Sequence, residues 1–175
     1  MIKMAKIILL LCLCMGAMPQ LWGQGRCPEI PSNYSWQTIE DYRKDADLVK
    51  KTLRWLTLAP LQLDLVTRSE ANLFVMRWLA GTPDLKIEIQ TSELPFIQAH
   101  PELLESFIHG MALAYLNKDG EVSRLDAYVS GFQSVAQVAS QSKAMTKSRP
   151  LKPLLKAAKR REIKQYAQKI VFSAA

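Results

Sequence analysis

The chain has 175 residues, of which 49% are hydrophobic, and this is enough for one domain with a buried core. Its 23 basic and 16 acidic residues give a formal net charge of +7, so anionic partners have to be considered. Three cysteines are too few for a small secreted scaffold held together by disulfides.

Residues 1–25 are predicted to be a signal peptide that is cleaved from the protein. Two lysines stand within residues 1–6, residues 7–18 are uninterruptedly apolar, and small residues follow. The apolar run is shorter than the roughly 20 residues that cross a bilayer. Cleavage is predicted after Gly25, with Gly23 as the alternative, and an uncleaved membrane anchor is the alternative for the whole segment. We therefore expect a periplasmic or secreted protein, which argues against nucleic acid as a partner.

Residues 26–175 are expected to form a single all-helical domain. Cys12 and Cys14 would leave with the signal peptide, so Cys27 would have no partner for an internal disulfide. Because Cys27 lies beside the new N-terminus and has no histidine near it in sequence, we expect it to have no chemical role. Sparing use of cysteine is typical of a bacterial periplasm or outer surface.

The first predicted helix begins near Trp36, with Ser35 or Thr38 as its cap, and ends before Pro60. Its apolar residues recur at steps of three and four, which is the pattern of an amphipathic helix with one buried face. They are Ile39, Tyr42, Ala46, Val49, Leu53 and Leu56.

A second helix is predicted over residues 68–80, with Ser69 as its cap and Gly81 just after its end. Residues 84–90 then alternate apolar and polar side chains, as a strand does. Since the chain offers no comparable strand to pair with it, this segment is either an extended connector packed along the helices or one arm of a dimeric ribbon. We favour the connector.

The clearest helix of the chain is predicted over residues 101–116, and it is the most apolar one after the signal peptide. Gly110 lies in its middle, where a glycine costs roughly 1 kcal/mol relative to alanine. We interpret Gly110 as the crossing point for the next predicted helix, residues 123–142, which is rich in small side chains. Residues 143–150 are predicted to be a loop or linker.

The C-terminal segment, residues 150–172, is predicted to be a basic pair of short helices joined near Lys159, Arg160 and Arg161, with one bent helix as the alternative. Together these elements predict an all-α fold. We expect an irregular bundle of about five helices in antiparallel pairs, with one short extended connector.

Positive charge is concentrated near the C-terminus. Residues 143–169 contain ten basic residues and one acid, a net charge of +9, whereas residues 26–142 carry a net charge of −4. The basic helices are predicted to bind an anionic envelope component or an acidic protein, with peripheral membrane contact as one form of it. A solvated helix face is the alternative. The predicted anion-binding residues are Lys152, Lys156, Lys159, Arg160, Arg161 and Lys164.

Glu105 and Glu102 are the candidates for a catalytic carboxylate. Glu105-Ser106 resembles the opening of the lytic transglycosylase motif, but the glycine- and glutamine-rich motif that should follow is absent. His109 lies one helical turn after Glu105, and two ligands are fewer than the three or four that zinc requires. No metal or other cofactor is therefore expected, and His109 is predicted to be a partly buried histidine at the rim of the helix.

The segment RSEANLFVMRWLAGTP, the 101–116 helix and the basic helix pair resemble an uncharacterised family of small exported all-helical proteins of Bacteroidetes-type bacteria. The resemblance implies the fold and the compartment, and it carries over no catalytic residue. We expect a non-enzymatic binding or accessory protein of the bacterial envelope. The alternative is a peptidoglycan-acting hydrolase or lyase that uses a helix-borne glutamate.

Overall fold

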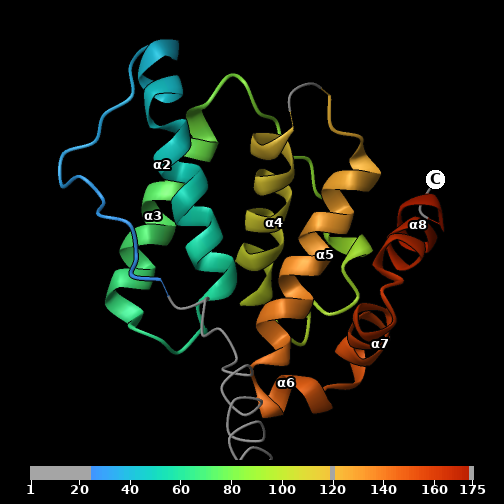
Figure 1. Ribbon diagram of the computed structural model, residues 1–175. Coiled ribbons are helices and arrows are strands. Elements are labelled where there is room, and N and C mark those ends of the chain that lie inside the picture. The colour runs from blue at the N-terminus through green and yellow to red at the C-terminus, as the bar shows by residue number, and fades with distance from the viewer. Residues whose placement is uncertain (1–24, 119–120, 174–175) are drawn as a thin grey trace, which may run out of the picture.

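The computed structural model describes residues 25–118 and 121–173, and in this part of the chain it is all helical, with no strand. The predicted fold class is therefore confirmed, while residues 1–24 of the predicted signal peptide lie outside the described part (Figure 1). The α-helices are α2 (Ile39–Leu58), α3 (Leu65–Gly81), α4 (Leu103–Asn117), α5 (Arg124–Ser140), α6 (Lys143–Lys147), α7 (Lys152–Arg160) and α8 (Ile163–Ser173). Two short 3₁₀ helices, η1 (Thr91–Glu93) and η2 (Arg149–Leu151), complete the fold.

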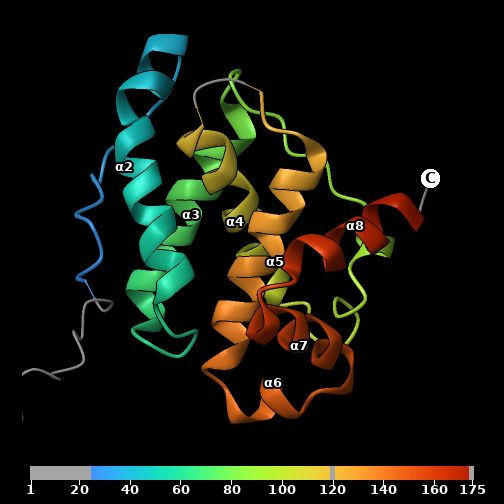
Figure 2. The same cartoon turned by 45° about the vertical axis from the view of Figure 1, so that its right-hand side comes forward.

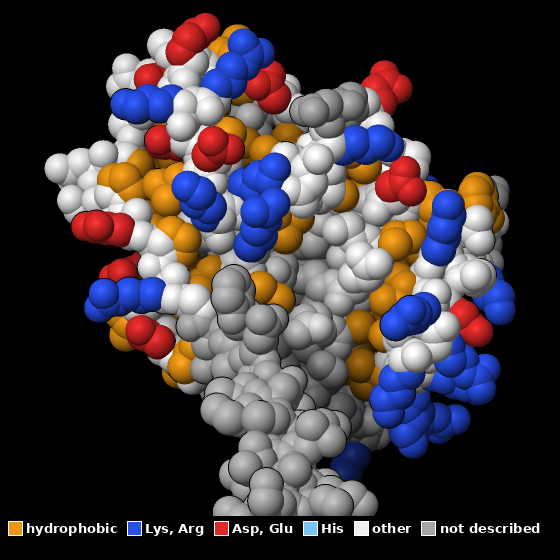
Figure 3. All heavy atoms as spheres, viewed as in Figure 1, with side chains coloured by type: hydrophobic (Ala, Val, Ile, Leu, Met, Phe, Trp, Pro, Cys, Tyr) orange, Lys and Arg blue, Asp and Glu red, His pale blue; other side chains and the backbone are white. Residues whose placement is uncertain are grey.

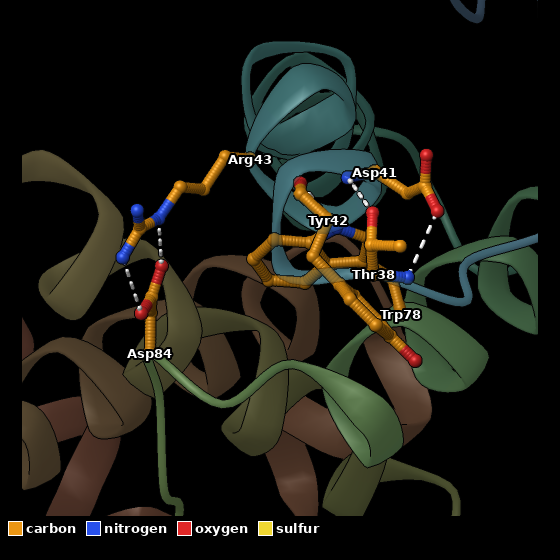
Figure 4. Close-up of polar contacts among 6 residues, drawn as sticks. All are labelled: Thr38, Asp41, Tyr42, Arg43, Trp78 and Asp84. Carbon is orange, nitrogen blue, oxygen red and sulfur yellow. Dashed lines mark hydrogen bonds and ion pairs between the residues drawn. The ribbon is translucent and has the colours of Figure 1, made fainter.

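Helix α2 is capped by Thr38, one of the two predicted caps, and not by Ser35. The Thr38 side chain accepts from the backbone N–H of Asp41 and the Asp41 carboxylate accepts from that of Thr38, so that two backbone donors of the first turn are satisfied (Figure 4). In the same region, the indole of Trp78 in α3 donates to the backbone oxygen of Tyr42 at 3.0 Å. These contacts fix the start of α2 and hold α3 against it.

Helix α3 begins at Leu65, three residues earlier than predicted, because Asp64 and not Ser69 caps it. The Asp64 carboxylate accepts from the backbone N–H of Thr67 at 3.2 Å, although Asp64 adopts a left-handed conformation with φ of 42°. Arg68 then reaches back and donates to the carbonyl oxygens of Leu56 and Ala59 at 3.0 Å each. The guanidinium thereby satisfies acceptors at the C-terminal end of α2.

The 84–90 segment is an extended connector, as favoured from the sequence. Leu85 is buried, and Ile87 and Ile89 pack against the hydrophobic core. Arg43 of α2 holds the start of the connector through an ion pair with Asp84 at 2.9 Å (Figure 4).

Helices α4 and α5 cross closely at Gly110, and this confirms the prediction. A Cβ atom at Gly110 would lie 2.4 Å from the backbone oxygen of Ser130 and 2.8 Å from Cα of Gly131, so no larger side chain fits. The Ser130 hydroxyl donates to the Gly110 carbonyl at 2.6 Å across the same crossing. Ser134 of α5 is also buried at this crossing. Helix α4 belongs to both core clusters, with Phe107 in one and Ala112 in the other.

The C-terminal segment contains one helix that the sequence reading missed. Residues 143–150, predicted to be a loop, form α6 and η2, because Ser142 caps α6 and Met145 is buried as its anchor. Helices α7 and α8 are separate, as predicted, and meet at Arg161, whose φ of 61° ends α7. Figure 2 shows α7 and α8 in front of α5, with α6 at the lower end.

Candidate functional site

A hollow of about 850 Å³ lies between α5 and the three C-terminal helices. We call it the lysine groove. Its lining side chains come from four helices and none of them is acidic: Gln133, Ala136, Gln137, Ser140, Thr146, Lys152, Leu155, Lys156, Ala158, Lys159 and Ile163. Figure 3 shows basic side chains gathered over α7 and α8, with exposed hydrophobic side chains beside them.

Helical spacing explains the two edges of the lysine groove. Lys152, Lys156 and Lys159 stand at positions i, i+4 and i+7 of α7, so they follow one side of that helix over about 10 Å. Helix α5 presents an uncharged edge with the same spacing, formed by Gln133, Gln137 and Ser140.

The floor of the lysine groove is apolar. Ala136 of α5 and Ile163 of α8 are buried, and Leu155 and Ala158 of α7 are partly buried. A groove with an apolar floor and positive charge along one edge suits a ligand that is itself part apolar and part anionic.

The basic side chains of α7 form no ion pair within the described part of the protein. Within residues 25–118 and 121–173, no ion pair involves Lys152, Lys156, Lys159 or Arg160, and all four side chains are exposed. On α8, by contrast, Lys164 interacts electrostatically with an acidic side chain, Asp126. The pKa of Asp126 is lowered first by a hydrogen bond with the Ser123 side chain and then by the positive charges of Lys118 and Lys164.

The structure thus brings three of the six predicted anion-binding residues around one groove. Arg160 and Arg161 are exposed at the end of α7, outside the groove lining, and Lys164 is exposed on α8. Sequence reasoning missed the opposite edge. Nothing in the sequence showed that α7 would lie along the polar side chains of α5.

Glu105 and Glu102, the candidate catalytic carboxylates, are exposed on the first turn of α4 and just before it. Glu102 contacts His100 Nδ1 at 3.1 Å, and neither glutamate lines the lysine groove. The described residues also hold no group of three or more His, Cys, Asp or Glu side chains suited to a metal ion.

The prediction of a partly buried histidine at position 109 was wrong, because α4 turns His109 fully into the interior, where it is 1% exposed. Its Nε2 lies 2.9 Å from Oδ1 of Asn72, so Nε2 carries the proton, while Nδ1 has no hydrogen-bond partner. Burial, together with the positive charge of Arg68, lowers the pKa of His109 to about 3. His109 is therefore neutral at physiological pH and unable to bind an anion by charge.

A buried carboxylate that the sequence did not single out ties the connector to α5. Glu93 of η1 is 4% exposed, and it accepts hydrogen bonds from Arg124 at 2.6 Å and 2.7 Å and from the Tyr128 hydroxyl. No described hollow opens onto this carboxylate. The three side chains form a structural link between η1 and α5.

Cys27 lies in a second hollow, of about 540 Å³, together with Leu63 and Asp64 of the α2–α3 connection. Its pKa is raised by burial first and by the negative charges of Asp64 and Glu70 second, so the thiol is protonated at neutral pH. A protonated thiol is a poor nucleophile.

No helix among the described residues is both long enough and apolar enough to cross a membrane. Comparison of the chain with protein-family models, with curated proteins and with solved structures gives no match. The resemblance to small exported helical proteins therefore stays a prediction, and function has to be argued from the lysine groove itself.

Proposed function

We propose that this protein is a non-catalytic binding or accessory protein of the bacterial envelope that contacts an anionic partner through its basic C-terminal helices. The observation that carries the proposal is the lysine groove, where Lys152, Lys156 and Lys159 stand unpaired along an apolar floor. The compartment rests on the predicted signal peptide.

Two lysines of α7, Lys152 and Lys156, are placed where they cost the fold stability. Lys152 and Lys156 are four residues apart, as are Lys156 and Arg160, and like charges at this spacing destabilise a helix by roughly 0.2–0.5 kcal/mol per pair. Lys152 also occupies the first turn of α7, at the positive end of the helix dipole, and this turn holds no acid. The fold itself does not explain cations that destabilise their own helix, whereas binding of an anionic partner would explain them.

The proposal is tested by binding of the purified protein to isolated bacterial envelopes, measured by co-sedimentation. Reversal of the groove edge by Lys152→Glu, Lys156→Glu and Lys159→Glu together should abolish envelope binding. The matched control reverses three exposed lysines of the N-terminal half, Lys44, Lys51 and Lys86, and so changes net charge equally. The control should bind like the unaltered protein.

Three outcomes would overturn the proposal. Equal loss of binding in both triple variants would mean that net charge, and not the lysine groove, is recognised. Envelope binding by the unaltered protein that has the same strength at low and at high salt would contradict an electrostatic contact at exposed lysines. A peptidoglycan-clearing activity that is lost on Glu105→Gln would establish the enzymatic alternative in its place.

A further inference from the structure

The connection between α2 and α3 exposes an unusual amount of apolar surface. Over the described residues, seven large hydrophobic side chains are conspicuously exposed, and four of these seven fall within nine consecutive residues. We call these four the apolar tip: Leu58, Leu63, Leu65 and Val66, which are 47%, 40%, 67% and 70% exposed. A concentration of large exposed apolar side chains is typical of a surface that binds another molecule.

The geometry of α3 makes the apolar tip project. Leu65 and Val66 are the first two residues of α3, and side chains in a helix lean toward its N-terminal end. Both side chains therefore extend past the end of the helix, away from the core. The carboxylate of the adjacent Asp64 accepts a hydrogen bond from the backbone N–H of Thr67 at the helix end.

Positive charge lies at the same end of the molecule as the apolar tip. Figures 1 and 2 both show the α2–α3 connection and α6 at the lower end. The side-chain nitrogen of Gln141, just before α6, donates to the backbone oxygen of Leu58 at 3.1 Å and so links the two. Lys143 and Lys147 of α6 are exposed there, and α7 with the lysine groove follows directly.

The chain also enters the described structure at this end. Gly25 and Arg26 line the same hollow as Leu63 and Asp64 of the α2–α3 connection. The apolar run of residues 7–18 precedes Gly25 in the sequence. If the predicted alternative of an uncleaved anchor holds, that run would keep the apolar tip near the bilayer surface.

We propose that the apolar tip inserts into the interfacial region of an anionic lipid bilayer while the lysines of α6 and α7 contact lipid head groups. Apolar side chains beside exposed lysines are the combination by which peripheral proteins bind such surfaces, because each lysine near the surface adds attraction to anionic lipid. The inference rests on the proposed function and names the partner as the bilayer.

The experiment uses vesicles of phosphatidylcholine with and without phosphatidylglycerol, and measures partition of the purified protein by co-sedimentation. Leu65→Ser with Val66→Ser should lower partition into the anionic vesicles by roughly tenfold or more, since two apolar side chains no longer leave water. The matched control, Ile39→Ser with Leu73→Ser, removes exposed apolar side chains outside the tip and should leave partition unchanged.

Depth of insertion gives a second readout that does not depend on affinity. With brominated phosphatidylglycerol in the vesicles, a tryptophan placed by Leu65→Trp should be quenched, whereas one placed by Leu73→Trp should not. Equal quenching of the two, or unchanged partition of the Leu65→Ser, Val66→Ser variant, would overturn the proposal. Loss of a dimer in that variant, with vesicle partition unaltered, would assign the apolar tip to contact with a second copy.

The same assay separates this inference from the proposed function. If the groove variant with Lys152, Lys156 and Lys159 reversed loses binding to envelopes but the protein never partitions into vesicles, the proposed function stands and the membrane inference is wrong. If the tip variant loses partition and the groove variant keeps it, the tip inserts and the groove is not the anion site.

Discussion

The two sides of helix α5 differ completely in how they are filled. Toward α4, Ser130 and Gly131 meet Gly110 so closely that a single added Cβ would lie 2.4 Å from a backbone oxygen. Toward α7, Gln133 and Gln137 of the same helix border a hollow of about 850 Å³. One side has no room for any ligand and the other has room for a substantial one.

This difference shows how the molecule separates stability from binding. The packed side holds the interior polar groups, including His109 and Ser134, each of which has a buried atom without a hydrogen-bond partner. The open side holds unpaired lysines that face water. Changes on the packed side should therefore alter folding, and changes on the open side should alter binding with little effect on folding.

The largest change in folding stability on the packed side is expected at low pH, and His109 is its source. The pKa of His109 is about 3 in the folded protein and 6.5 ordinarily. Between these two pH values the unfolded chain binds a proton that the folded protein does not bind. Stability from this group is complete above pH 6.5 and is lost as the pH falls toward 3, by about 3–5 kcal/mol. Urea unfolding at pH 7 and at pH 4 measures the loss.

The two histidines provide the control for that measurement. In His109→Gln the pH dependence between 7 and 4 should flatten, whatever the absolute stability of the variant. His100→Gln should keep the steep dependence, because it leaves the buried His109 unaltered; His100 contacts Glu102 and Ser148. An equally steep dependence in His109→Gln would show that carboxylates alone cause the acid loss.

The next effect tests the crossing of α4 and α5 itself. Gly110→Ala should lower the free energy of unfolding by about 1–3 kcal/mol, because backbone atoms of α5 cannot give way, and this exceeds the gain in helix propensity of roughly 1 kcal/mol. Gly81→Ala is the matched control. Its new Cβ would meet the hydroxyl end of the Tyr42 side chain and not a backbone atom, so this variant should lose less stability. If both variants lose the same stability in urea unfolding, the crossing is not the tight contact that we describe.

The packed side of α5 was predictable from the sequence and the open side was not. An isolated glycine in the middle of an apolar helix, followed by a helix rich in small residues, is a local pattern with one simple explanation, and Gly110 confirms it. The lysine groove depends on how α7 lies against α5, and that follows from Met145 anchoring α6, in a stretch whose basic, polar composition predicted a loop.

The errors at single residues have the same origin. His109 shares a helix face with exposed Glu105 in a simple projection, yet Asn72 of α3 supplies the contact that allows the imidazole to be buried. Asp64 caps α3 in a left-handed conformation that propensities disfavour, so the helix was predicted to start too late. Partners that are distant in sequence decided both cases.

A smaller effect is expected at Tyr166 of α8, which packs against Phe132 of α5. Its hydroxyl is buried without a hydrogen-bond partner, so Tyr166→Phe should raise stability at pH 7 by about 1 kcal/mol. Burial also raises the pKa of Tyr166 to about 12. Because the hydroxyl ionises near pH 10 in the unfolded chain, the folded protein loses stability as the pH rises from 10 toward 12. The variant should show a shallower alkaline loss in urea unfolding. A destabilised variant would mean that the hydroxyl has a partner, such as a buried water.

The smallest effect on folding is expected on the open side, and its sign is informative. Lys156→Glu converts three repulsive pairs along α7, with Lys152, Lys159 and Arg160, into attractive ones, so stability should rise by about 0.5–1 kcal/mol once salt screens these exposed pairs. Lys156→Gln should give roughly half that gain, because it removes repulsion without adding attraction. Envelope binding by the Lys156→Glu protein should fall at the same time. A variant that is more stable and binds less would show that α7 keeps its lysines for a partner, whereas a less stable variant would mean that Lys156 supports the fold.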